Sequence, residues 1–163
     1  MIIYTPIYLH KHLGLPWTQI SVIFAIMLSA FVIFPSIVGL LVDKYKINKL
    51  KILTTGLLIM GIATIAISGI YSTNAVIWAV IMFITRIGAS IVESTADIFF
   101  FTHIKEEEAH LLGVYRDMMP LSYLLAPLIA SAFILIFPLK YIFILLGAIV
   151  LLGLLYIPKL KHR

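Results

Sequence analysis

The chain has 163 residues, of which 63% are hydrophobic and only 12% are charged, and its mean hydropathy is +1.14. Soluble domains carry charge on about a quarter of their residues, so this composition excludes a soluble globular class. The net charge of +5 does not indicate nucleic-acid binding, because the basic residues lie at the ends of apolar segments. Cysteine is absent, which excludes disulfides and thiolate metal sites.

Residues 1–9 are apolar but too short to cross a bilayer. They lack the basic region and the small-residue cleavage site of a signal peptide. Two interpretations stay open: the segment lies in the membrane interface, or it is the end of a span whose beginning is missing.

Five apolar segments further along the chain are long enough to cross a bilayer as helices. We place these spans at residues 17–42, 50–70, 74–101, 111–137 and 139–157. The connections between them are short, so neighbouring spans should run antiparallel. The sequence therefore predicts an all-α, polytopic membrane helix bundle, with one membrane domain over residues 1–163 and no soluble domain.

The distribution of basic residues predicts the orientation, because Lys and Arg collect on the cytoplasmic side. Arg86 and Arg116 lie within spans, and one set of span ends carries only Lys11 and Lys140. The other set carries eight: Lys44, Lys46, Lys49, Lys51, Lys105, Lys159, Lys161 and Arg163. We therefore expect the C-terminus in the cytoplasm and the N-terminus outside, in the inner or plasma membrane.

The spans differ in character. The second and fifth carry no charge between their ends and predict lipid-facing helices on the outside of the bundle. The third and fourth carry intramembrane charges, which cost at least roughly 2.5–3.5 kcal/mol near the bilayer centre. Both are therefore expected to face inward.

The third span carries a polar stripe. Arg86, Ser90, Glu93, Ser94 and Asp97 are spaced at i, i+4, i+7, i+8 and i+11, which places them on one face of a helix. This pattern indicates a helix that faces the bundle interior or lines a cavity, and it points to something polar that crosses the membrane or binds within it. The alternative is a buried polar network that only fixes helix packing.

Depths follow from a rise of about 1.5 Å per residue, which places Arg86 within roughly 3 Å of the mid-plane and Glu93 about 8 Å toward the cytoplasm. Glu93 is the candidate proton carrier; a permanently paired, structural Glu93 is the alternative. Asp97, Arg116 and Asp117 lie at similar depths on the cytoplasmic side, and we predict that Asp97 and Arg116 form a pair, directly or through water.

The end of the first span carries a motif. Gly39 is expected to let another helix approach closely, and Asp43 and Lys44 follow at the cytoplasmic end. This segment resembles the Gly-x-x-x-Asp-Arg/Lys-x-Gly-Arg/Lys-Arg/Lys loop of the major facilitator superfamily. The match is partial, because Lys46 replaces the second glycine and the next basic residue comes only at Lys49. It fits the weaker copy of the motif, between the family's eighth and ninth helices.

The resemblance implies that the chain is the C-terminal half of such a transporter, with helices eight to twelve and the end of helix seven. It implies alternating access, in which two six-helix halves rock about a central site, so a missing N-terminal half or a partner chain would complete the cavity. The residues of the substrate or ion pathway would be Arg86, Ser90, Glu93 and Ser94. The cytoplasmic gate and loop motif would comprise Gly39, Asp43, Lys44, Asp97, Arg116 and Asp117.

The function expected from these features is secondary active transport of a small solute, with a proton or another coupling ion. The alternative is a small membrane scaffold or assembly protein without transport activity. No catalytic motif is visible, so we do not expect an enzyme. The histidines show no metal-ligand spacing, and neither a metal nor a cofactor is expected.

Overall fold

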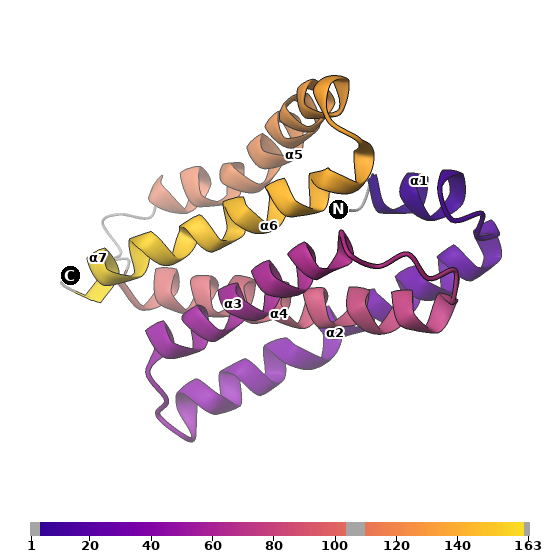
Figure 1. Cartoon of the computed structure of the whole chain (residues 1–163). Helices are drawn as coiled ribbons and strands as arrows, with labels where there is room; N and C mark the ends of the chain where they lie inside the picture. Colours follow the sequence, from indigo (N-terminus) through magenta and orange to yellow (C-terminus); the bar gives the residue numbers. More distant parts are fainter. Residues whose placement is uncertain (1–3, 104–109, 162–163) are drawn as a thin grey trace.

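The structure, a computed structural model, describes residues 4–103 and 110–161. All regular secondary structure in these residues is helical (Figure 1). The first helices are α1 (Tyr4–Lys11), α2 (Trp17–Asp43), α3 (Lys49–Ile67), α4 (Ala75–His103) and α5 (His110–Ile136). The last apolar segment is divided into η2 (Leu139–Tyr141), α6 (Ile142–Leu152), η3 (Gly153–Tyr156) and α7 (Ile157–Lys161).

Five helical segments are long and apolar enough to cross a membrane. They are Trp17–Asp43, Lys49–Ile67, Ala75–Thr102, Leu112–Ile136 and Leu139–Leu160. Their positions lie close to the five apolar segments of the sequence, because run length alone decides where such a helix fits. The predicted all-α membrane bundle is confirmed.

Local signals explain where the helices begin. The Asn48 side chain accepts a hydrogen bond from the Leu50 N–H at 2.9 Å, and Asn74 does the same for Val76 at 2.9 Å. Each cap satisfies an N–H group that has no partner within the helix. The turn between α1 and α2 passes through Gly14, whose φ of 69° is open to glycine without steric cost.

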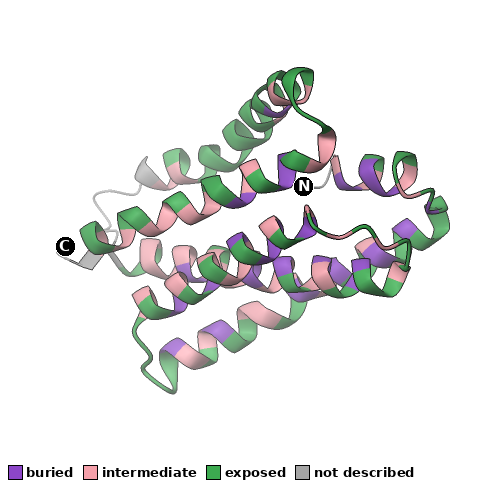
Figure 2. Ribbon diagram, in the orientation of Figure 1, coloured by how far each residue is buried: buried purple, intermediate pink, exposed green. Residues whose placement is uncertain are grey.

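The helices pack in an order that the sequence did not predict. α4 lies between α2 and α3, and the last segment packs on the far side of α3 (Figure 1). The second span, α3, was expected to face lipid, but it is packed on two sides. α5 was expected to face inward, yet it meets the rest of the bundle at few places and is exposed along most of its length (Figure 2).

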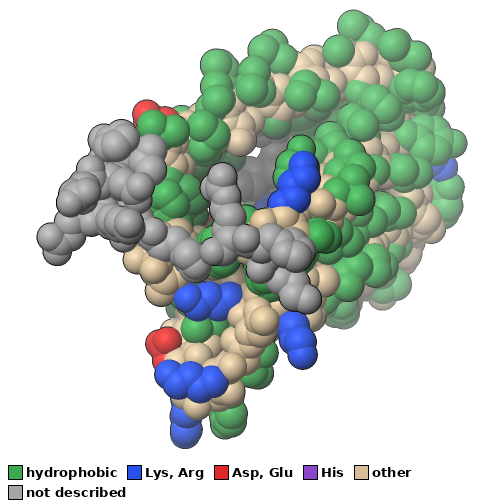
Figure 3. Space-filling model, turned by 90° about the vertical axis from the view of Figure 1, so that its left-hand side faces the viewer, with side chains coloured by type: hydrophobic (Ala, Val, Ile, Leu, Met, Phe, Trp, Pro, Cys, Tyr) green, Lys and Arg blue, Asp and Glu red, His purple; other side chains and the backbone are tan. Residues whose placement is uncertain are grey.

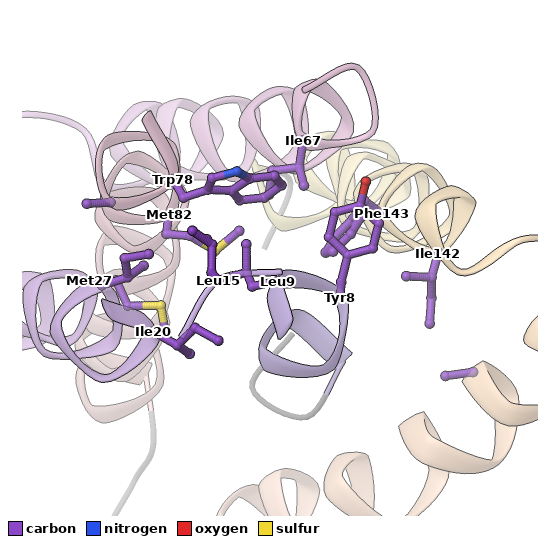
Figure 4. Packing of buried hydrophobic residues seen from close by; sticks show 13 residues of the cluster. Tyr8, Leu9, Leu15, Ile20, Met27, Ile67, Trp78, Met82, Ile142 and Phe143 are labelled. Carbon is purple, nitrogen blue, oxygen red and sulfur yellow. The ribbon is translucent and has the colours of Figure 1, made fainter. Parts of the chain in front are cut away.

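The short helix α1 is held against one end of the bundle by an aromatic cluster (Figure 4). The Tyr8 ring meets the Phe143 ring edge-on at 5.5 Å and lies 5.8 Å from Trp78. Trp78 and Phe143 are fully buried, and Trp78 Nε1 donates to the Ser72 carbonyl at 2.8 Å. This apolar packing fixes the start of the described chain beside α4 and α6.

The two ends of the bundle differ in charge. The 44–48 connection, the end of α4 and α7 lie together, whereas α1 and the 68–74 connection lie at the opposite end (Figure 1). We call the first of these the lysine-rich end. Figure 3 looks onto it and shows Lys and Arg side chains gathered there. Lys49 Nζ donates to Thr102 Oγ1 at 2.8 Å and so links α3 to α4 at this end.

Candidate functional site

A cavity of about 350 Å³ lies halfway along the bundle, between α3, α4, α5 and α6. Tyr4 of α1 lines one wall, and its hydroxyl donates to the Pro127 carbonyl of α5 at 3.2 Å. The polar residues that line the cavity come from four helices: Tyr4, Thr64, Thr85, Arg86, Ser122 and Tyr123. We call this space the Arg86 cavity.

Arg86 supplies the positive charge of the Arg86 cavity. Its Nε atom is buried and has no hydrogen-bond partner among the described residues. A guanidinium removed from water without a partner is strongly destabilising. The mid-span arginine that stood out in the sequence therefore lines a cavity with its Nε donor unpaired among the described residues.

The other members of the polar stripe do not share this cavity. Ser90 is fully buried, and its hydroxyl has no partner among the described residues. Glu93 is exposed, and Ser94 is half-buried. At about 100° per residue, Ser90 and Ser94 lie about 40° and 80° to one side of Arg86, and Glu93 lies about 20° to the other. The stripe is therefore wider than one cavity wall.

Contacts of α4 show which way the stripe turns. Phe83, about 60° from Arg86 on the side of the two serines, packs against Phe34 of α2 with ring centroids 6.4 Å apart. Thr85 and Ala89, on the other side, line the Arg86 cavity. The serines are therefore turned toward α2, and Arg86 is turned toward α5 and α6.

Asp97 makes no direct ion pair with Arg116 in the part of the chain that the structure describes. The Tyr115 hydroxyl of α5 donates to Asp97 Oδ1 at 2.7 Å, and within the described ranges the Arg116 side chain makes no ion pair. The Tyr115 ring stacks on Phe100 with centroids 4.2 Å apart. The predicted direct pair of Asp97 and Arg116 is wrong, because neighbouring residues on α5 point about 100° apart and Tyr115 is the one turned toward α4.

The remaining gate candidates are exposed. Asp43, Lys44, Arg116 and Asp117 all present exposed side chains. Gly39 has no atom within 4 Å of the position that a Cβ would take, so no helix approaches closely there. The expectation of a close helix contact at Gly39 is not met within the described chain.

A second hollow of about 530 Å³ lies at the lysine-rich end, between the 43–50 segment and the end of α4. It is lined by Asp43, Lys46, Ile98 and Phe99, among others. Lys46 has a φ of 52°, a backbone conformation that favours glycine. The position where the motif usually has its second glycine is thus the one where this chain needs left-handed backbone.

Three tyrosines belong to the site although the sequence did not single them out. Tyr115 bonds Asp97, and Tyr4 and Tyr123 line the Arg86 cavity. Aromatic residues are common in membrane helices, so residue type alone carried no signal. The spacing of Tyr115 next to Arg116 offered a weak one, since either residue could face Asp97 at that depth.

The fold is that of a polytopic helical membrane protein with an intramembrane charged cavity. Comparison with protein families finds that the model of the Major Facilitator Superfamily matches residues 1–163. The chain therefore belongs to the Major Facilitator Superfamily, a family of membrane transporters. Comparisons with curated proteins and with solved structures find no match.

Proposed function

We propose that the chain is one membrane domain, without a soluble domain, and forms one half of a carrier that moves a small solute by alternating access. A missing N-terminal half or a partner chain would supply the opposite wall of the site. The proposed setting is the inner or plasma membrane, with the C-terminus in the cytoplasm and the N-terminus outside.

The observation that carries this proposal is the Arg86 cavity. A scaffold has no use for an unpaired guanidinium in mid-span, whereas a carrier needs unsatisfied groups that a solute can satisfy. The exposure of α5 supports the proposal further, because this helix has few contacts and leaves an open face for another half.

The proposed roles divide the residues into a solute pathway in the middle of the bundle and a gate at its cytoplasmic end. Arg86 meets the solute, and Ser90 and Ser94 line the neighbouring part of the pathway. Glu93 is exposed and has no partner within the part of the chain that the structure describes, which suits a carboxylate that exchanges a proton. The proposed cytoplasmic gate consists of Gly39, Asp43, Lys44, Asp97, Arg116 and Asp117, and the Tyr115–Asp97 bond supports it because it ties α4 to α5.

The experiment starts with the DNA upstream of Met1, read for an in-frame continuation that encodes six or seven further spans. The complete protein, or this chain with an encoded partner half, is then reconstituted in liposomes and tested for uptake of a panel of small solutes. We expect saturable uptake that Arg86→Gln abolishes. Glu93→Gln should remove the dependence of uptake on a pH gradient.

The scaffold alternative makes the opposite prediction. If Arg86→Gln and Glu93→Gln altered only the folded yield in the membrane, and no solute were taken up by the completed assembly, the carrier proposal would fall.

A further inference from the structure

We propose that the Arg86 cavity binds a small organic monoanion, whose carboxylate pairs with Arg86 and whose apolar body lies against α5 and α6. This inference names a solute class for the proposed carrier and in that respect rests on the proposed function. The binding itself is a property of the cavity and can be measured without transport.

The positive charge of the Arg86 cavity indicates that its ligand is an anion. Of the described residues that line it, Arg86 is the one with a formal charge at neutral pH. Its buried Nε atom has no partner, so the positive charge is not neutralised locally. A planar guanidinium matches a carboxylate, which accepts two parallel N–H bonds.

The chain's own nearby carboxylates do not fill this role. Glu93 lies seven residues further along α4, about 10 Å along the helix axis, and its side chain is exposed. Asp97 lies one turn beyond and accepts the Tyr115 hydroxyl. Neither residue lines the Arg86 cavity.

The hydroxyl groups around the cavity limit the solute further. Thr64 donates to the Met60 carbonyl at 2.6 Å, and Thr85 to the Met82 carbonyl at 2.7 Å. Ser122 donates to the Met118 carbonyl at 2.8 Å. Since these hydroxyl protons and that of Tyr4 are used within the protein, few donors remain for a solute besides Arg86 and Tyr123. A neutral polyhydroxylated solute such as a sugar would lose more hydrogen bonds to water than it could regain.

The walls and the size of the cavity complete the description. The apolar lining includes Met60, Ala126, Leu146, Ile149 and Val150. A volume of about 350 Å³ lies at the lower end of the range for small-molecule sites. A bare inorganic anion would need several donors to replace its water, whereas an acid with a short apolar body fits both the single cation and the apolar wall.

The test uses the full chain in lipid nanodiscs and radiolabelled benzoate, with empty nanodiscs to subtract partitioning into lipid. Benzamide is the neutral probe of the same shape. We expect saturable benzoate binding, at least tenfold tighter than benzamide binding. Arg86→Gln should weaken benzoate binding at least tenfold and leave benzamide binding unchanged. Arg86→Lys should retain part of it. Lys51→Gln is the matched control, because it removes a positive charge from an exposed residue that does not line the cavity.

Circular dichroism of each variant shows whether it is folded, and Arg86→Lys keeps the test valid should Arg86→Gln fail to fold. Equal binding of benzoate and benzamide, or benzoate binding unaffected in both Arg86 variants, would overturn the inference. So would benzoate binding that disappears when a complementary half is present, because Arg86 would then meet a carboxylate of that half. Binding without uptake by the completed assembly supports this inference and removes only the carrier proposal. Uptake of neutral solutes without benzoate binding would support the carrier proposal and overturn the inference of an anion-binding cavity.

Discussion

At the scale of single residues, the Tyr115–Asp97 hydrogen bond, together with the stacking of Tyr115 on Phe100, joins α5 to α4 near the lysine-rich end. The rise of a helix placed Arg116 and Asp97 at similar depths. Depth says nothing of rotation, and one residue along α5 turns the side chain by about 100°. The phenol, which is amphipathic, therefore occupies the position expected for the arginine.

We expect Tyr115→Phe to lower the stability of the chain in detergent by about 1–3 kcal/mol, because the half-buried Asp97 carboxylate loses its donor. In an Asp97→Leu background the same change should have little further effect. Arg116→Gln should stay within about 0.5 kcal/mol of the unmodified chain. Thermal unfolding of the four variants measures the coupling. If Arg116→Asp restored the stability lost in Asp97→Arg, the result would contradict this assignment and show that Asp97 and Arg116 form an ion pair.

The left-handed backbone at Lys46 makes a second prediction at this scale. A non-glycine residue in that conformation destabilises the folded state by roughly 1–2 kcal/mol. Glycine avoids this strain, but it loses more backbone entropy on folding, which offsets part of the gain. Lys46→Gly should therefore raise the stability by up to about 1 kcal/mol. Lys44, whose φ is −85°, is the control, and Lys44→Gly should lower stability in the same unfolding assay. If both changes lowered it equally, the strain at Lys46 would be disproved.

At the scale of helices, glycines set how closely α3 approaches its two neighbours. A Cβ on Gly88 of α4 would lie 2.5 Å from the Met60 nitrogen and 2.8 Å from the Gly56 carbonyl oxygen of α3. A Cβ on Gly147 of α6 would lie 2.8 Å from the Gly61 carbonyl oxygen. Small residues of this kind let membrane helices pack backbone to backbone, which explains how α3 packs closely against both α4 and α6.

Gly88→Val is expected to separate α3 from α4, because the atoms it meets are backbone and cannot rotate away. Overpacking of this kind costs about 1–3 kcal/mol or more, so folded yield and melting temperature in detergent should both fall. Gly113 in α5 has nothing within 4 Å of its Cβ position, and Gly113→Ala should be neutral or stabilising by up to about 1 kcal/mol. Similar losses at both positions would mean that helix propensity, not packing, is being measured.

At the scale of the whole molecule, the charge difference between the two ends predicts the orientation in the membrane. The chain contains no cysteine, so single cysteines can be introduced without background. Thr73→Cys should react with a membrane-impermeant maleimide added to intact cells, and Lys46→Cys should react only after the membrane is opened. The reversed pattern would show that the lysine-rich end faces outward.

Apolar run length in the sequence determined the five long helices, and the motif formed by Gly39, Asp43 and Lys44 carried the family resemblance. Both could be read because each depends on residues close together in the chain. The sequence also pointed to Arg86, since a mid-span arginine is conspicuous whatever its surroundings. The sequence did not predict how each helix is rotated about its axis or which helices are its neighbours. In the structure, Ser90 faces α2, Tyr115 rather than Arg116 bonds Asp97, and α3 is more enclosed than α5.

Tertiary structure decided these points because they depend on which helix faces are in contact. The α3–α4 and α3–α6 contacts are fixed by glycines. In the sequence, a glycine that allows close helix packing looks the same as a glycine that only makes the backbone flexible. Once those contacts are made, the Arg86 side chain lines the cavity between α3, α4, α5 and α6. Local residue patterns thus determine the helices of this protein, while close packing of helices distant in sequence determines where its unpaired charge lies.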